Sequence, residues 1–475
     1  TDISHWRADQ WYHMALLWDQ SSARLLVDGV CVARGQFPGF PAAPPAFEVG
    51  TNALVALDEL RISDVMREEL QVADEVTTPA SFRPIAYQPT PSQERPPLPP
   101  SPARPTVVAL TPGAPNLFVD DWLVELRNNV TRRLGQVHKA EGNPVIVPEG
   151  LWEETAAFPF SGGVFRLEPN RWVMFYNTYI RWRRGRDGTN VCVAYSEDGE
   201  HWVKPALGLL QVRGTTQNNV VLSTRLDNAA VVYDPGDTDP ARRWKMVTYE
   251  SADKGTGLYG YLSPDGLHWT RLPEILIADA GDRSSLWHDT RRGKYVIFTR
   301  YAPRYRGRYI FQSESDDFVH WSEPELVLDW SAGDRAYARQ HYGAGAFVYG
   351  DMYLGFLEVF HTTYRRLDTQ LLASHDGRAW SRVCEGEVFL PNGPEGAFDS
   401  FWAFPAASPP IRVGDELWFY YAGRGHPHTS PPPPIWPGED ETGALRQSYW
   451  ACTGLARMRL DGFASSIPAV SPGTS

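Results

Sequence analysis

The 475-residue sequence has little cysteine, little lysine and no long apolar run, and each shortage excludes a class of protein. Cys31, Cys192, Cys384 and Cys452 are too few and too widely spaced for a disulfide framework, and they lack metal-ligand spacing. No apolar run approaches the roughly 18 residues of a membrane span, so we expect no membrane partner. The formal net charge of -12 argues against a nucleic-acid partner, because phosphate binding needs clustered positive charge.

Turn-forming and aromatic residues are abundant instead. The chain has 40 glycines, 40 prolines, 18 tryptophans, 21 tyrosines and 21 phenylalanines, which is typical of a turn-rich β-protein. Nearly all of the 45 basic residues are arginines. The planar guanidinium group suits carboxylates and hydroxyl-rich ligands held in a fixed geometry.

A proline-rich segment, residues 76–115, divides the chain and includes the run RPPLPP. Proline cannot pair inside a sheet and favours extended polyproline II, so this segment is predicted to be a linker. Residues 1–75 read as strands at 11–18, 23–29 and 56–63, with a turn near 19–22. The phrases WYHMALLWD, LLVDG and LDELRIS resemble the second half of a laminin-G-like, concanavalin-like carbohydrate-binding domain, which predicts a partial β-sandwich.

After the linker, a turn motif of the form Ser-x-Asp-(Gly)-x-x-Trp recurs four times. Its copies lie at 196–202, 263–269, 315–321 and 374–380. The Ser and Asp side chains can cap the turn backbone, glycine permits a positive φ, and tryptophan can fold back between sheets. Four copies at regular intervals indicate a repeat architecture.

A pair of strands precedes each copy, and a fifth pair follows the last one. The pairs are 163–165 with 172–176, 229–233 with 244–249, 285–287 with 295–299, 345–348 with 353–357, and 402–404 with 417–421. Units of this size predict an all-β, five-bladed β-propeller over residues 116–466, followed by a tail at 467–475. Its closing strand is expected at 455–460 or at 117–119.

The propeller topology predicts where the chemistry lies. The first two strands of a blade are antiparallel, so the start of the first and the end of the second share one face. Carboxylates expected on that face as catalytic groups are Asp227, Asp282, Glu358, Asp399 and Glu154. Side chains expected to bind substrate there are Arg300, Arg424, His341, His361, Trp152, Trp287 and Trp402.

Paired carboxylates beside arginines and aromatic rings are what glycosidic cleavage requires. One carboxyl group protonates the leaving oxygen, and a second activates water or attacks the sugar. Glu358 lies in an apolar strand, which favours its protonated form and the role of proton donor. Asp227 and Asp282 lie at more solvated strand starts and suit the role of base or nucleophile. The predicted partner is a poly- or oligosaccharide, and no cofactor is expected.

The propeller segment also resembles a known group of proteins. The phrases LFVDDWLVE, SEDGEHW, SPDGLHW, LGLLQVRGTTQNNVV and LARMRLDGFASS look like a bacterial family of five-bladed propeller proteins similar in architecture to glycoside hydrolase families 32 and 43. The resemblance implies a secreted or periplasmic polysaccharide-processing enzyme, with acidic residues of the first blades at the channel.

Three other interpretations stay open. A propeller can bind carbohydrate without cleaving it, because fold does not fix function. A sialidase-like hydrolase would use Arg300, Arg339 and Arg424 as an arginine triad. A metal site would draw on histidines, namely His341, His361, His426 and His428, and a structural calcium ion leaves little trace in a sequence.

Overall fold

A computed structural model describes most of the chain beyond the linker. The described residues are 14–18, 22–27, 30–36, 96–108, 110, 114–159, 161–179, 189–224, 226–301, 307–336, 339–428 and 451–468. The chain divides into two compact units, Thr1–Thr90 and Pro91–Ser475, and the division falls within the predicted linker. Among the described residues, no helix has the length and apolar character needed to cross a membrane.

The first unit contains a three-stranded antiparallel sheet. Its strands are β1 (Met14–Trp18), β2 (Ser22–Val27) and β3 (Val30–Gln36), in the order β1-β2-β3. The register pairs Met14 with Val27 and Trp18 with Ala23, so β1 and β2 are antiparallel. The predicted strand at 56–63 lies outside the described residues, and the laminin-G likeness stays a prediction.

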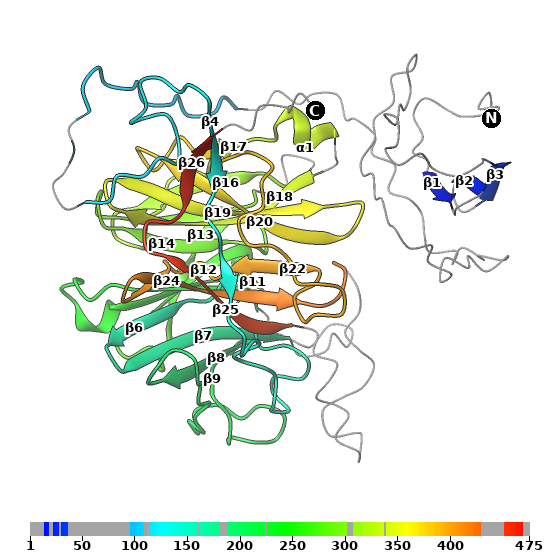
Figure 1. Cartoon of the computed structure of the whole chain (residues 1–475). Coiled ribbons are helices and arrows are strands. Elements are labelled where there is room, and N and C mark those ends of the chain that lie inside the picture. The colour runs from blue at the N-terminus through cyan, green and yellow to red at the C-terminus, as the bar shows by residue number, and fades with distance from the viewer. Residues whose placement is uncertain are drawn as a thin grey trace. The chain divides into compact units, whose positions relative to one another are not determined.

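The second unit is almost entirely β, which confirms the predicted fold class. Three antiparallel sheets of four strands follow one another along the chain (Figure 1). They are β6 (Val164–Glu168), β7 (Arg171–Tyr179), β8 (Thr189–Ser196) and β9 (Val220–Thr224); β10 (Leu226–Tyr233), β11 (Trp244–Ala252), β12 (Gly255–Ser263) and β13 (Thr270–Ala278); and β14 (Ser285–Asp289), β15 (Lys294–Thr299), β16 (Ile310–Ser315) and β17 (Glu325–Leu328). The described helices are short: α1 (Ala332–Ala336) and the 3₁₀ turn η1 (Pro240–Arg242).

The remaining strands of this unit form a nine-stranded sheet and a two-stranded ribbon. The nine strands are β18 (Arg339–Tyr349), β19 (Met352–His361), β20 (Arg366–Ser374), β21 (Ser381–Arg382), β22 (Trp402–Pro405), β23 (Ile411–Val413), β24 (Glu416–Arg424), β25 (Cys452–Arg459) and β5 (His138–Lys139). A single parallel pair, Leu367 with Trp402, joins β20 to β22. The sheet thus holds the last two predicted strand pairs, and the count of five blades stays a prediction.

Both ends of the second unit take part in its sheets. The strand predicted at 455–460 is present within β25, and β5 pairs with its outer edge. The alternative closing segment, residues 117–119, is not a strand. Farther out, β4 (Val130–Leu134) pairs with β26 (Ala464–Pro468), as Figure 1 shows. Early and late segments of the unit are therefore held together by backbone hydrogen bonds.

Hydrogen bonds also join successive sheets. The side chains of Asn228 and Ser285 each donate to a backbone carbonyl of the next sheet or of the segment before it, at Ser284 and Ala344 respectively. Within the nine-stranded sheet, Thr369 of β20 donates to the carbonyl of Ala403 in β22. Thr453 of β25 donates over 3.0 Å to the carbonyl of Ala157, in the segment before the first sheet. Each sheet thereby covers the flank of the next, which protects the short edges.

The four turn motifs fold as predicted. In the first copy, Ser196 Oγ accepts from the Gly199 amide over 2.8 Å, and Asp198 Oδ1 accepts from two later amides. The Trp202 indole donates to the Gly199 carbonyl over 3.1 Å. Phe318 replaces glycine in the third copy and keeps its positive φ of 67°. Buried packing of that ring offsets the backbone cost, which for a bulky residue is of the order of 1 kcal/mol.

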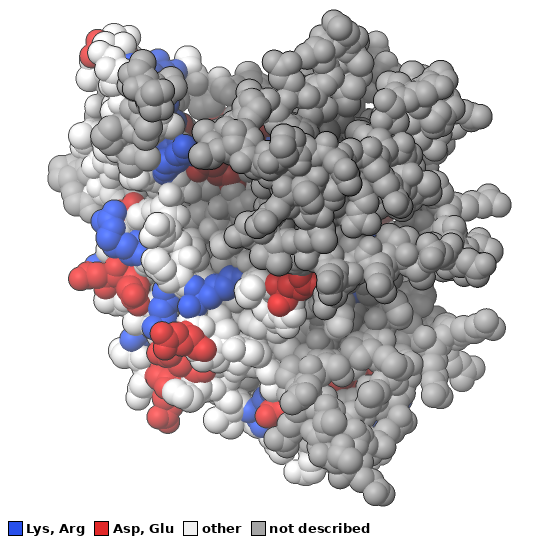
Figure 2. All heavy atoms as spheres, turned by 45° about the vertical axis from the view of Figure 1, so that its right-hand side comes forward, with Lys and Arg blue, Asp and Glu red and all other residues white. Residues whose placement is uncertain are grey.

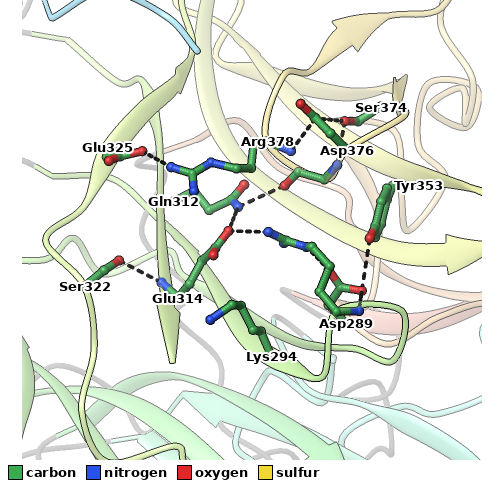
Figure 3. Close-up of polar contacts among 12 residues, drawn as sticks. Asp289, Lys294, Gln312, Glu314, Ser322, Glu325, Tyr353, Ser374, Asp376 and Arg378 are labelled. Carbon is green, nitrogen blue, oxygen red and sulfur yellow. Dashed lines mark hydrogen bonds and ion pairs between the residues drawn. The ribbon is translucent and has the colours of Figure 1, made fainter. Parts of the chain in front are cut away.

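At this turn end, charged groups between two neighbouring sheets are matched with one another. The hairpin from Asp289 to Lys294 lies beside the turn of Ser374 and Asp376 (Figure 3). The Arg292 guanidinium is paired with Asp289 and, over 2.8 Å, with Glu314. Arg378 is paired with Glu325. Both side chains, together with Glu314, border a cavity of about 130 Å³. On the described surface visible in Figure 2, basic and acidic side chains are likewise interspersed.

Candidate functional site

The opposite end of the sheets carries the predicted site. β14 begins at Ser285, which pairs with Phe298 of β15, so the residues just outside this pair lie at the same end. One of them, Arg300, forms an ion pair with the other, Asp282. The Asp282 side chain is 49% exposed, whereas that of Arg300 is 9% exposed. The topological argument that a strand start and the next strand's end share one face therefore placed Asp282 and Arg300 together correctly. The Asp282 carboxylate of this pair is half exposed.

Charged and titratable groups from several sheets lie close enough to Arg300 to affect its pKa. Burial lowers the pKa of Arg300, and the positive charge of Arg308 lowers it further, whereas Tyr342, Glu358 and Asp227 act in the opposite direction. Asp227 comes from β10, Asp282 precedes β14 and Glu358 belongs to β19.

Asp227 is placed by a second electrostatic neighbour. Burial, followed by the charge of Asp227, raises the pKa of Tyr249, and Arg300 opposes this effect. Asp227 is half-buried and lies at a register shift between β10 and β11. Asp227 and Arg300 therefore act on the same tyrosine, and the predicted separation of the three carboxyl groups, within about 10 Å, stays a prediction.

Glu358 is engaged in a buried ion pair with Arg283. Its carboxylate accepts from Arg283 Nε over 2.9 Å and also from Arg283 Nη2. The side chains are 3% and 2% exposed, respectively. The apolar strand therefore holds a buried ion pair in which one guanidinium group engages both carboxylate oxygens. The donor role of Glu358 stays a prediction, and this ion pair argues against it.

Asp399 also has a structural role. It accepts from Lys139 Nζ over 2.5 Å and from the Tyr421 hydroxyl over 2.9 Å, and its side chain is 3% exposed. Burial, together with this carboxylate, raises the pKa of Tyr421. With these partners the buried carboxylate ties β5 to β24, and its catalytic role stays a prediction. Glu154 is buried as well and pairs with Arg213, and its catalytic role stays a prediction.

Two residues predicted to bind substrate belong to the interior. Trp287 packs in a core cluster with Phe298 and Tyr353 and is 1% exposed. His341 is fully buried, and its Nε2 lies 3.2 Å from the carboxylate of Asp334 in α1. Burial lowers the pKa of His341, so it is a neutral core histidine. Both substrate-binding roles stay predictions, and the burial of the two rings argues against them.

Of the four other predicted residues, Trp152 and His361 keep some exposed surface, whereas Arg424 and Trp402 are buried. The Trp152 indole is half-buried and donates to Asn219 over 2.7 Å. His361 lies 2.7 Å from the carboxylate of Asp368. Arg424 stacks on Trp402, with its guanidinium carbon 4.8 Å from the ring centre, and donates to the Pro427 carbonyl. The substrate-binding roles of these residues stay predictions.

Several side chains near Arg300 form a group that we name the arginine–aromatic cluster, of which the sequence rule identified Arg300, Arg424 and Trp402 and missed the other four. Its members are Arg300, Arg308, Arg424, Tyr342, Phe360, Trp402 and His428. His428 was noticed only as a possible metal ligand. Arg308 precedes the third strand of its sheet, and the third strand of an antiparallel sheet starts at the same end as the first. Including third-strand starts would have found it.

Metal ligation has no support in this region. Among the residues described by the structure, no group of three or more His, Cys, Asp and Glu side chains could hold a metal ion. His361 and His428 are instead engaged with Asp368 and with the Tyr342 hydroxyl.

Comparisons with known proteins give only distant likenesses. No family model and no curated protein matches the chain. A solved structure described as a glycoside hydrolase is 15% identical with a TM-score of 0.45, covering 73% of this chain and 96% of its own. A β-1,2-mannobiose phosphorylase from Listeria innocua is 14% identical with a TM-score of 0.47, covering 68% and 97%. A thermostable family-43 glycoside hydrolase is 14% identical with a TM-score of 0.44, covering 70% and 98%. At these values the likeness carries no argument about activity.

Proposed function

We propose that the second unit is a glycoside hydrolase that cleaves a poly- or oligosaccharide at the end of the sheets marked by Arg300. The observation that carries the proposal is the ion pair of Arg300 with the half-exposed Asp282, together with the influence of Asp227 on the same guanidinium. Two carboxylates from neighbouring sheets around one arginine match the acid–base pair of glycosidic cleavage.

The two carboxylates take different roles. Arg300 stabilises the ionised form of Asp282, so Asp282 is assigned to activate water or attack the sugar. Asp227 is then the proton donor, because Glu358 is engaged by Arg283. Arg300 orients Asp282 toward the anomeric carbon. For these two roles, the Asp227 and Asp282 side chains must lie on opposite sides of the glycosidic bond that is cleaved.

The test is a product screen on polysaccharides and aryl glycosides with the parent protein, Asp227→Asn and Asp282→Asn. Each substitution keeps the shape of the side chain and removes its acid–base capacity, so turnover should fall by about 10²–10⁴-fold. Asp351→Asn is a matched control, because Asp351 is exposed in the turn between β18 and β19. Parental turnover in both site variants would overturn the assignment.

A carbohydrate-binding propeller without catalysis is the outcome to be distinguished. In that case the parent protein would bind glycans and release no product from any of them, and Asp282→Asn would change only the affinity. Measuring binding and product release on the same glycans separates the two functions. The site chemistry favours hydrolysis, since stacking on sugars alone needs no carboxylates around an arginine.

A further inference from the structure

We infer that the arginine–aromatic cluster is an oxyanion subsite of the proposed active site, which accepts the carboxylate of an acidic sugar unit or a free phosphate. The inference rests on the proposed function for its place beside Asp282, and it names the class of ligand that this end of the protein selects.

Three guanidinium groups converge on one set of rings in this cluster. The guanidinium carbon of Arg300 lies 4.6 Å from the centre of the Tyr342 ring, and that of Arg308 lies 5.3 Å from it. Arg308 also lies 5.3 Å from the Phe360 ring centre. Arg424 lies 4.8 Å from Trp402, whose ring is 5.9 Å from Tyr342.

His428 lies within the same set of rings. It stacks on Trp402 at 5.4 Å with an interplanar angle of 18°, and its Nε2 lies 3.1 Å from the Tyr342 hydroxyl. Burial lowers the pKa of His428 to about 3, and the charges of Arg308, Arg424, Arg300 and Arg365 all act in the same direction. Burial is the largest cause of this lowering, and the neighbouring guanidinium groups add to it.

Arg308 carries a positive charge that its described neighbours do not neutralise. Its Nη1 donates to the Gln340 side chain, and among the described residues no carboxylate lies within ion-pair distance of it. Burial lowers the pKa of Arg308, which shows that its charge is partly removed from water. A neutral amide does not compensate a desolvated cation, whereas an oxyanion does so through a planar, two-point contact.

The turn end of the same sheets offers a comparison, because the arginines there have a structural role between sheets. There, Arg292 and Arg378 are both paired with carboxylates (Figure 3). At the site end, Arg300 is paired with the half-exposed Asp282, whereas the described side-chain partner of Arg308 is the neutral amide of Gln340. Clustered like charges in a half-buried place destabilise the fold unless a ligand neutralises them. The geometry thus points to an anionic ligand.

The test measures binding without turnover. Glucuronic and galacturonic acid are titrated calorimetrically against glucose and galactose, and inorganic phosphate is titrated separately and in competition. The acids or phosphate should bind at least ten-fold more tightly than the neutral sugars, with an affinity that falls as salt increases. Arg308→Gln should weaken that binding by about 10–100-fold and leave neutral sugars unaffected, while Arg308→Lys should be intermediate.

Arg378→Gln is the matched control at the turn end and should bind as the parent does. Circular dichroism and thermal denaturation of each variant establish that it is folded. Binding of the sugar acids alone assigns the subsite to a carboxylate on the substrate, and competitive binding of phosphate assigns it to a free oxyanion. Equal affinity for neutral and acidic sugars, with no phosphate binding and no effect of Arg308→Gln, would overturn the inference. Failure of hydrolysis leaves these measurements intact, so the two proposals fail separately.

Discussion

The buried pair of Arg283 and Glu358 allows a direct test of structural against catalytic roles. Glu358→Gln keeps the shape of the side chain and removes the negative charge opposite Arg283, whose side chain is 2% exposed. Removing one partner of a buried ion pair costs about 3–5 kcal/mol, because the other charge stays desolvated. Contacts of Arg283 with the Phe404 ring, 5.1 Å from its guanidinium carbon, compensate little of that cost.

The assay is urea denaturation followed by tryptophan fluorescence, with Glu141→Gln as the exposed control. The control should stay within about 0.5 kcal/mol of the parent protein. Arg283→Met and the double variant complete a cycle, in which the two single costs should exceed the double cost by more than 1 kcal/mol. A Glu358→Gln protein of parental stability that has lost turnover would refute this reasoning and restore Glu358 as a proton donor.

Two further measurements test the electrostatics of the fold. Lys204 Nζ lies 2.8 Å from the fully buried Glu153, so Lys204→Met should lower the free energy of unfolding by about 3 kcal/mol; a loss below 1 kcal/mol would contradict a structural pair. His428 has a pKa lowered to about 3, against about 6.5 when unfolded, so the unfolded chain binds the extra proton and stability falls as pH falls below 6.5. Between pH 7 and 5.5 this group should cost about 1 kcal/mol after allowance for its partial exposure, and His428→Gln should show a smaller loss over that range.

The strands and turns were largely predictable because their signals are local. Each Ser-x-Asp turn satisfies its own backbone, as in Ser196 and Asp198, so its conformation depends little on the rest of the chain. Paired apolar runs separated by short turns can form little else than hairpins. The joining of β20 to β22 and the pairing of β4 with β26 were not predictable, since they depend on contacts between segments far apart in sequence.

The site was predictable only where chain topology alone decides proximity. Asp282 and Arg300 were identified because strands β14 and β15 bring their ends together. Burial was not visible in the same pattern: Trp287 was expected at the end of a strand and His341 shortly before one, and both side chains are interior in the structure. Ion-pair partners were also hidden, since Lys139 reaches Asp399 from a segment 260 residues away.

Charged side chains that stabilise the fold differ in pairing and in exposure from those proposed to act on a ligand. Asp282 and Arg283 are adjacent in sequence, yet one side chain is 49% exposed and the other is 2% exposed. Arg283 forms an ion pair with Glu358 in the interior, whereas the half-exposed Asp282 forms an ion pair with Arg300. The Asp282 carboxylate is half exposed and partly screened by water, whereas Arg300 is buried and lies near Arg308 and the half-buried Asp227. The function proposed above would account for this placement, because substrate binding and catalysis both require charges that can still interact with a ligand in the free protein.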